Sequence, residues 1–249
     1  MKICPVILAG GFGRRLAPVS TPYQPKQFHD LLGCGETLIQ STIKRALMFA
    51  EPEDVITVAN AVHEVHVEKQ LAEINQGLLQ GVIYEDEPRN TAYAISLALE
   101  QVADDSILLI MPSDHFINGN FFDDAENAIE LAQKGKIVTF GIMPEYPSTN
   151  FGYLLQNTFI EKPDYATAVK LLRSGALWNS GIFVAKASVI REEFTKYHTN
   201  FSLYYPFDKA VMEKTKKMEV IPAQFNWDDL GNWESLEKYL KGSSLRLAS

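Results

Sequence analysis

A glycine-rich turn directly after an apolar segment constrains the fold of this chain more than any other feature. Residues 3–9 are apolar and predict a buried β-strand, and three of the next four residues, 10–13, are glycine. Two cations, Arg15 and Lys26, follow. Glycine lets the backbone approach an anion, and N–H groups and cations offset its charge. The pattern therefore predicts a phosphate-binding loop at the end of the first strand.

The loop differs from two common nucleotide-binding motifs. No Gly-Lys-Ser/Thr sequence closes it, so it is not a Walker A loop. Arg and Leu follow where a dinucleotide fingerprint requires a third glycine. Taken alone, these residues would also suit a tight strand-to-helix turn with two surface cations.

Composition argues against several classes of function. The formal net charge of the 249 residues is −8 and the isoelectric point is about 5.2, which argues against a nucleic-acid-binding surface. No apolar segment approaches the length of a membrane span, and the first residues lead into the predicted strand rather than into a signal peptide. Cys4 and Cys34 are the only cysteines, so no disulfide framework is expected. We expect a cytoplasmic protein with no nucleic-acid and no membrane partner.

Predicted strands and helices alternate along the chain, which is typical of a mainly parallel sheet covered on both faces. The predicted strands cover residues 3–9, 55–59, 82–84, 106–111, 136–142, 151–156, 159–161, 181–185 and 218–221. The predicted helices cover residues 38–47, 62–74, 92–102, 122–134, 165–173, 188–197, 207–215 and 233–240. Thr37 is the expected cap of the first helix, and Asn90 or Thr91 that of the third. Strands lie closer together in the second half, so we expect an α/β fold with a doubly wound, mixed, mostly parallel sheet.

Three carboxylates occupy positions that suit a hard cation. Asp114 follows the strand at 106–111 and so lies at a carboxyl end, where open α/β sheets bind ligands. Asp228 and Asp229 lie in a turn between two tryptophans. One of them, with Asp114, would form the two-carboxylate site that Mg²⁺ favours when water and phosphates complete its coordination. The alternatives are a cap for Asp114 and a solvated turn for the pair.

Polar residues at strand ends in the second half suit recognition of an anion and of hydroxyl groups. Glu161 and Lys162 would point to opposite sides of a continuing strand. We therefore expect Lys162 to bind an anionic ligand and Glu161 to accept a hydroxyl, rather than a local ion pair. Asn179, before a serine and a glycine, suits polyol recognition, although a turn explains it equally well.

Three histidines are weaker candidates for a site. His115 follows Asp114 in a turn, and we expect it to have a structural role. His63 and His66 are three residues apart on a predicted helix and have no third ligand nearby. A solvated helix face is therefore favoured over a metal site for this pair.

The chain carries a set of ordered motifs nearly from end to end. They are Leu8-Ala9-Gly10-Gly11-x-Gly13-x-Arg15-Leu16-x-Pro18, Pro25-Lys26-Gln27-Phe28, Arg89-Asn90-Thr91-Ala92, Pro112-x-Asp114-His115, Phe140-Gly141-Ile142, Phe159-x-Glu161-Lys162-Pro163, Trp178-Asn179-Ser180-Gly181, Ala210-Val211-Met212-Glu213-Lys214 and Trp227-x-Asp229-x-Gly231-x-Trp233. In these motifs the chain resembles the sugar-phosphate nucleotidyltransferases, which make nucleotide sugars. It resembles most closely their mannose-1-phosphate guanylyltransferase (GDP-mannose pyrophosphorylase) branch.

The resemblance implies a role for each matching residue. Nucleotide binding would fall to Leu8, Ala9, Gly10, Gly11 and Gly13, with Arg15 on the triphosphate, and to Arg89, Asn90 and Thr91 near the base and ribose. Lys26 would reach the reacting phosphate, and Asp114 and Asp229 would hold Mg²⁺. Gly152, Glu161, Lys162 and Asn179 would take the sugar phosphate. Arg15, Lys26, Asp114 and Lys162 are the implied catalytic residues.

The resemblance also implies an activity and a domain organisation. The activity is transfer of GMP from GTP to a sugar 1-phosphate, mannose 1-phosphate, with GDP-mannose and pyrophosphate as products and Mg²⁺ as cofactor. One domain of the nucleotide-diphospho-sugar transferase (GT-A-like) type would cover residues 1–241, with a nucleotide-binding half to about 117, a sugar-phosphate-binding half from about 118, and a polar tail at 242–249. A homodimer is compatible with this sequence.

Departures from the family pattern leave two alternatives open. Arg14 stands where the family has threonine, and the segments between 153 and 159 and between 197 and 210 are short. One alternative is the same chemistry on another sugar 1-phosphate, such as a manno-heptose. The other is a catalytically silent regulatory subunit that binds nucleotide sugars.

Overall fold

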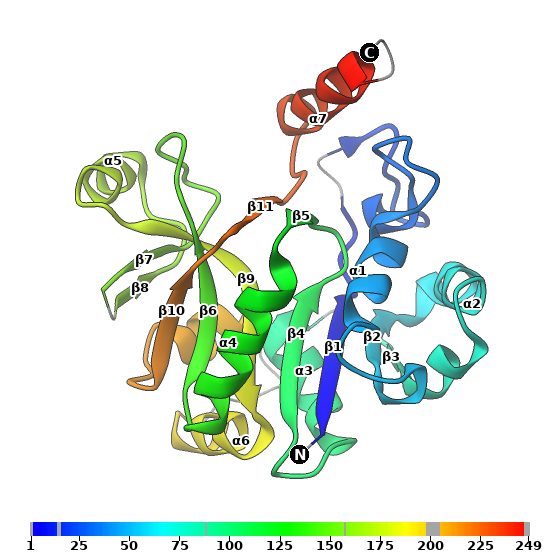
Figure 1. The fold of residues 1–249 in the computed structure, drawn as a ribbon, viewed down its shortest axis with the longest axis horizontal. Helices are drawn as coiled ribbons and strands as arrows, with labels where there is room; N and C mark the ends of the chain where they lie inside the picture. The colour runs from blue at the N-terminus through cyan, green and yellow to red at the C-terminus, as the bar shows by residue number, and fades with distance from the viewer. Residues whose placement is uncertain (1, 14–15, 88, 157, 198–204, 247–249) are drawn as a thin grey trace. The chain divides into compact units, whose positions relative to one another are not determined.

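The computed structural model describes residues 2–13, 16–87, 89–156, 158–197 and 205–246. Its helices are α1 (Leu38–Ala46), α2 (Glu64–Ala72), α3 (Asn90–Glu100), α4 (Phe121–Gln133), α5 (Tyr165–Arg173), α6 (Ala187–Lys196) and α7 (Trp233–Arg246) (Figure 1). Shorter helical turns include η2 (Lys26–Phe28) and the π-helix η6 (Asp208–Met212). None of the described helices is long and apolar enough to cross a membrane.

The main sheet is mixed, as the sequence predicts. Its strands are β1 (Ile3–Ala9), β2 (Ile56–Asn60), β3 (Val82–Glu85), β4 (Ile107–Pro112), β6 (Ile137–Ile142), β9 (Leu177–Lys186) and β10 (Met218–Pro222), in the order β10-β6-β9-β4-β1-β2-β3. The hairpin of β7 (Tyr153–Leu155) and β8 (Thr158–Ile160) pairs with β9. A separate two-stranded sheet joins β5 (Phe116–Gly119) to β11 (Phe225–Asp228), and the sequence did not predict either strand.

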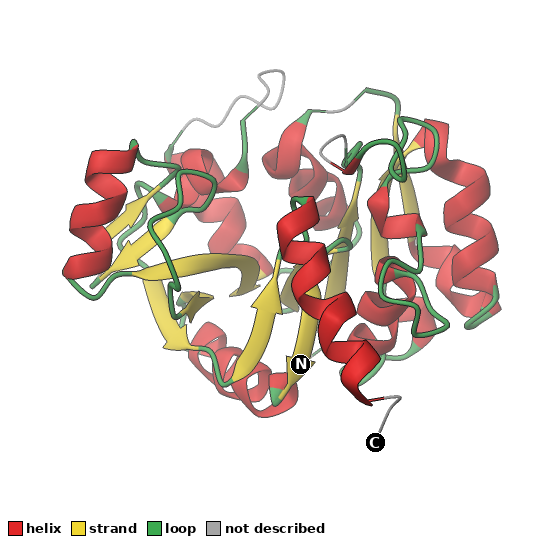
Figure 2. Cartoon of the chain, turned by 90° about the horizontal axis from the view of Figure 1, so that it is seen from above, coloured by secondary structure: helices red, strands yellow, loops and turns green. Residues whose placement is uncertain are grey.

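Strand direction follows the alternation of strands and helices except at β9. The pairs β2/β3 and β10/β6 are parallel. The N–H of Ile107 donates to the carbonyl of Lys2 and that of Ser113 to the carbonyl of Leu8, an equal offset that makes β4 parallel to β1 as well. Strand β9 is antiparallel to both β4 and β6. The α/β fold with a mixed, doubly wound sheet is therefore confirmed, and helices flank the strands (Figure 2).

The chain divides into two compact units. Unit 1 contains Met1–Val6, Arg89–Met111 and Asn118–Phe225, and unit 2 contains Ile7–Pro88, Pro112–Ile117 and Asn226–Ser249. The chain therefore passes between the units several times. The division into halves near residue 117 stays a prediction.

The core of unit 1 forms where α4 packs on β6, β9 and β10. Phe121 of this helix lies 6.0 Å from Phe140 and 5.3 Å from Phe225 between ring centroids. All three rings are buried, and tilted or edge-to-face pairs of this kind add to the free energy gained by burying their area.

In unit 2, the C-terminal helix packs against residues from the start of the chain. The buried cluster consists of Leu16, Leu31, Leu38, Leu230 and Leu236. Tyr239 of α7 lies 4.4 Å from Phe116 between ring centroids. Helix α1 begins with the predicted cap: Thr37 and Gln40 form a capping box.

Two predicted element boundaries are wrong at positions that matter for function. Strand β9 begins at Leu177, not at 181, because Trp178 pairs with Ile142 on one side and Tyr153 on the other. Asn179 therefore lies in a strand and not in a turn. Helix α3 has no side-chain cap from Asn90 or Thr91: it begins at Asn90, which has a φ of 65°, and Arg89 is at its N-cap.

Candidate functional site

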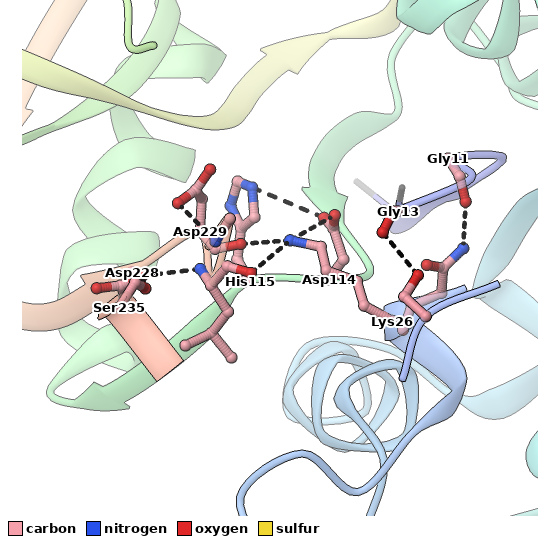
Figure 3. A network of polar contacts seen from close by, with 12 residues as sticks. Gly11, Gly13, Lys26, Asp114, His115, Asp228, Asp229 and Ser235 are labelled. Carbon is pink, nitrogen blue, oxygen red and sulfur yellow. Dashed lines mark hydrogen bonds and ion pairs between the residues drawn. The ribbon is translucent and has the colours of Figure 1, made fainter. Parts of the chain in front are cut away.

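The glycine loop of unit 2 is held from behind by two side chains. The amide of Gln27 donates to the carbonyls of Ala9 (3.2 Å) and Gly11 (2.8 Å), and the Ser20 hydroxyl donates to that of Gly13 (2.6 Å) (Figure 3). Gln27 and Ser20 are both buried. These bonds fix the loop through its carbonyl groups. The backbone at Gly11 remains exposed.

Glycine is required at two positions of this loop for different reasons. Gly13 has a φ of +55°, and a Cβ there would lie 3.0 Å from the backbone nitrogen of Lys26. A Cβ on Gly10 would lie 2.8 Å from the Glu85 carboxylate. That carboxylate, at the end of β3, is buried beside the loop, and the sequence analysis missed it. A single acid at the end of a short strand gives no distinctive motif.

Lys26 is the centre of a polar network in unit 2. Its side chain is 5% exposed, and its ammonium lies 3.0 Å from Oδ2 of Asp114. The same ammonium donates to the carbonyls of Asp229 and Leu230 (Figure 3). Lys26, Asp114 and Asp229, which are far apart in sequence, are thus brought together, and their roles stay predictions.

Asp114 stays ionised although it is partly removed from water. Burial raises its pKa, but the charges of Lys26 and His115 outweigh this and hold the pKa of Asp114 below its usual value. His115 accepts a hydrogen bond from the indole N–H of Trp227 (3.1 Å) at Nδ1, and its Nε2 lies 3.7 Å from Oδ1 of Asp114. Burial lowers the pKa of His115. The expected structural role of His115 fits this position.

The neighbouring aspartates 228 and 229 differ in what their carboxylates do. Asp228 accepts from the N–H of Leu230 (2.7 Å) and from the hydroxyl of Ser235, so it fastens the turn to the start of α7. Asp229 accepts from the N–H of Gly231 (3.1 Å). Its backbone carbonyl, rather than its carboxylate, accepts from the Lys26 ammonium.

The donor set around Lys26 suits a hard divalent cation. No cluster of three His, Cys, Asp or Glu side chains forms a ready metal site in the described part of the chain. The carboxylate of Asp114 and the backbone of Asp229 nevertheless hold a positive charge, the Lys26 ammonium. Hard oxygen donors of this kind, few in number, fit Mg²⁺ whose other ligands are water and phosphate.

His63 is buried, so the expectation of a solvated helix face is wrong for it. Its side chain has no exposed area, and its Nε2 lies 2.9 Å from the Pro22 carbonyl. Its ring packs 5.4 Å from that of Phe12 in the glycine loop and 5.6 Å from that of Phe28 beside Lys26. Burial lowers the pKa of His63, which favours the neutral ring. Periodicity alone could not show that the loops at 12 and 22 cover this helix end.

In unit 1, Glu161 and Lys162 form the local ion pair that the sequence analysis disfavoured. The Lys162 ammonium lies 2.8 Å from Oε1 of Glu161. The reason is the backbone: β8 ends at Ile160, and Lys162 has a φ of +43°, so the chain turns and the two side chains meet. The Lys162 side chain is 60% exposed and that of Glu161 is 6% exposed, so the ammonium remains open to an anionic ligand.

Gly152 and Asn179 lie close to this ion pair. A Cβ on Gly152 would lie 2.9 Å from Oε2 of Glu161, and the Gly152 carbonyl accepts from the N–H of Asn179 (2.8 Å). The N–H of Glu161 donates to Glu213 (3.3 Å), which comes from the segment after η6. Unit 1 therefore gathers the four predicted sugar-phosphate residues around one strand end.

The remaining predicted nucleotide-binding residues lie in different surroundings. Thr91 accepts from the N–H of Phe207 (2.8 Å), so its hydroxyl joins α3 to the start of η6. The Arg89 guanidinium lies 5.0 Å from the centroid of the Tyr93 ring, and Asn90 is exposed. Leu8 and Ala9 are the last residues of β1. Arg15, with its neighbour Arg14, lies outside the described residues.

Comparison with known proteins finds similar sequences and similar structures. A family model described as Nucleotidyl transferase matches residues 4–243. The chain is 37% identical over 94% of its length to mannose-1-phosphate guanylyltransferase 2 of Escherichia coli O157:H7, and 37% identical over 95% to mannose-1-phosphate guanylyltransferase RfbM of Salmonella typhimurium. Among solved structures, the mannose-1-phosphate geranyltransferase of Thermus thermophilus has a TM-score of 0.83 at 28% identity, and the match covers 96% of this chain and 79% of the Thermus chain.

The matched region is only part of the two curated relatives. The chain spans 59% of the length of the E. coli protein and 58% of the Salmonella protein.

Proposed function

The chain belongs to the nucleotidyl transferase family, and from this premise we propose that it transfers GMP from GTP to mannose 1-phosphate. One observation carries the proposal: in unit 2 a glycine loop lies beside a buried lysine, which the Asp114 carboxylate and the Asp229 carbonyl hold. The names of the guanylyltransferase relatives support the choice of both substrates.

The reaction is a displacement at one phosphorus atom. A phosphate oxygen of mannose 1-phosphate attacks the α-phosphorus of GTP, and the bond from that phosphorus to the α,β-bridging oxygen breaks. The products are GDP-mannose and pyrophosphate, and no covalent enzyme intermediate is needed. Positioning and charge neutralisation therefore account for most of the catalysis.

Unit 2 supplies the groups for the triphosphate. The exposed backbone at Gly11 donates N–H groups to phosphate oxygens, while Gln27 and Ser20 keep the loop in shape. Lys26 lies behind the loop and provides a fixed positive charge for the reacting phosphate. Asp114 and Asp229 would hold Mg²⁺, which, when bound, neutralises phosphate charge that would repel the attacking oxygen.

Unit 1 supplies the groups for the sugar phosphate. The exposed Lys162 ammonium binds the phosphate of mannose 1-phosphate, and Glu161 accepts a sugar hydroxyl. Gly152 leaves room beside the Glu161 carboxylate, and Asn179 offers an amide to a second hydroxyl. A nucleophile held in this way attacks without the entropic cost of a free encounter.

We further propose that Glu85 selects guanine. Its buried carboxylate lies against Gly10 of the loop and can accept from both N1–H and the 2-amino group of guanine, a pair of donors that adenine lacks. In Glu85→Gln one acceptor becomes a donor, so we expect kcat/KM for GTP to fall about 10²-fold while that for ATP changes little. Asp86→Asn, at the exposed neighbour, is the matched control. An equal fall for both nucleotides would contradict the assignment.

The proposed function is tested by varying the nucleotide and the sugar 1-phosphate. Purified protein is incubated with Mg²⁺, mannose 1-phosphate and each of the four NTPs, and pyrophosphate release is measured. We expect the highest kcat/KM with GTP. If a manno-heptose 1-phosphate gives a higher kcat/KM than mannose 1-phosphate, the chemistry stands and the sugar is wrong. Binding of GDP-mannose without turnover of any pair would identify a regulatory subunit instead.

We also propose a cellular location and an oligomeric state: a cytoplasmic homodimer. Neither Cys4, which is buried, nor Cys34, which is exposed, forms a disulfide, as suits a cytoplasmic enzyme whose substrate is GTP. Light scattering after size exclusion would test the homodimer.

A further inference from the structure

A chain of three polar side chains runs beside the sugar-phosphate residues of unit 1. The Thr139 hydroxyl of β6 lies 2.7 Å from Oδ1 of Asn179 and 2.9 Å from the carbonyl of Ile182. At the other end of the Asn179 amide, Nδ2 donates to Oδ1 of Asp208 (3.0 Å), the first residue of η6. Asn179 is 7% exposed and Thr139 is fully buried, so water cannot replace these partners freely.

One hydroxyl proton cannot serve both acceptors of Thr139. With Oδ1 of Asn179 facing Thr139, the hydroxyl has two acceptors and one proton. If the amide turns over, Nδ2 donates to Thr139, whose proton then goes to Ile182. The amide oxygen then faces Asp208, and only a protonated Asp208 can donate to it. The two amide orientations thus match the two protonation states of Asp208.

We propose, on the basis of the function above, that Asp208 is a positioning residue of the sugar-phosphate site. Through its hydrogen bond it sets which end of the Asn179 amide is offered to the sugar. Nothing in the sequence pattern singled out Asp208, because it precedes the Ala-Val-Met-Glu-Lys motif rather than belonging to it.

Burial and neighbouring charges shift the titration of Asp208 toward neutral pH. Burial first, and then the charges of Glu161 and Glu213, raise the pKa of Asp208 to about 7 against the opposing effects of its own backbone N–H and of Lys162. These groups come from the segment after β8 and from the segment after η6. Above neutral pH, Asp208 therefore adds a third negative charge beside the ammonium proposed to bind the sugar phosphate. Binding of mannose 1-phosphate is expected to weaken as pH rises through 7, because like charges repel.

The coupling is tested first without any substrate. The side-chain amide resonances of Asn179 are followed by NMR from pH 5.5 to 8.5 in the full chain. We expect a titration with a midpoint near 7, and its loss in Asp208→Asn. Thr139→Val keeps the side-chain shape but removes the hydroxyl that favours the protonated arrangement, so its midpoint should move to lower pH. Resonances that do not titrate in the wild type, or that titrate unchanged in both variants, would overturn the proposal.

The role in binding is tested with mannose 1-phosphate by calorimetry over the same pH range. The phosphate of mannose 1-phosphate itself titrates with a pKa near 6. The wild-type Kd is therefore divided by the Kd of Asp208→Asn, which cancels the effect of the ligand's own titration. This ratio should rise about tenfold between pH 6 and 8. The control is Asp105→Asn, at an exposed carboxylate: the wild-type Kd divided by the Kd of this variant should not change with pH. A flat ratio with Asp208→Asn would refute the positioning role. Absence of mannose 1-phosphate binding at every pH would count against the proposed function, while the amide titration would still decide the coupling.

Discussion

At the scale of single residues, Lys26 is the side chain on which the proposed nucleotide site of unit 2 most depends. It is buried, and its ammonium joins Asp114 to the backbone of Asp229 and Leu230. A buried charge with three partners stays where it is held. Its three acceptors converge on one point, which suits lysine, a point charge, better than a neutral polar residue.

Lys26→Met should lower kcat by about 10²- to 10³-fold, the usual effect of removing one fixed transition-state donor. Without its ammonium, the pKa of Asp114 should rise, because burial then acts with less opposition. Steady-state kinetics measure the first effect, and the pH dependence of kcat/KM the second. Lys44→Met is the matched control, since Lys44 is an exposed lysine of the same unit. Equal kinetics in the two variants would remove Lys26 from the site.

Substitutions at the neighbouring residues Asp228 and Asp229 test which carboxylate stabilises the turn and which would bind Mg²⁺. Asp228→Asn weakens the acceptor for Leu230 and Ser235, so about 1 kcal/mol of stability and about 2–4 °C in Tm should be lost with turnover retained. Asp229→Asn weakens a single accepted bond, from the N–H of Gly231, so it should lower Tm less than Asp228→Asn does while it abolishes Mg²⁺-dependent turnover. Calorimetry and pyrophosphate release separate the two effects. The reverse pattern would move the metal ligand to Asp228.

At the scale of elements, sequence patterns predicted the strands and helices themselves better than the contacts between them. Alternating strands and helices, the Thr37 cap and the end of β1 are local features and follow from residue order. The early start of β9 depends on pairing with β6 and β7, which no local pattern contains. Burial of His63 depends on two loops, and the Glu161–Lys162 contact on a positive φ after β8. The site residues were thus identifiable by type, whereas their contacts, and Asp208 and Glu85, were not.

The end of β8 and the residue before β7 offer a test at this scale. Gly152→Ala would place a methyl group 2.7 Å from the Phe159 ring and 2.9 Å from the Glu161 carboxylate, so Glu161 must move. We expect KM for mannose 1-phosphate to rise about tenfold, equivalent to about 1.4 kcal/mol, with KM for GTP unchanged. Initial rates with each substrate varied in turn give both constants. A rise in KM for GTP alone would contradict the placement of these residues on the sugar phosphate.

At the scale of the whole molecule, the proposed function requires an acidic chain to bind two anionic substrates through a few fixed cations. The net charge is −8, so the attraction must come from local groups such as Lys26 and Lys162, each held beside a carboxylate. Each of the two units contains one of these lysines. The proposed roles of the glycine loop and of the residues around Glu161 and Lys162 fit one reaction, in which an entire GMP group would pass from one phosphate to another.

The most direct test of this account is to follow the α-phosphate of GTP. Protein, Mg²⁺ and mannose 1-phosphate are incubated with GTP labelled at the α-phosphorus, and the products are separated. The account predicts that all of the transferred label is found in GDP-mannose and that the pyrophosphate released in equal amount is unlabelled. Label found in free GMP, or no labelled nucleotide sugar with any sugar 1-phosphate, would contradict it.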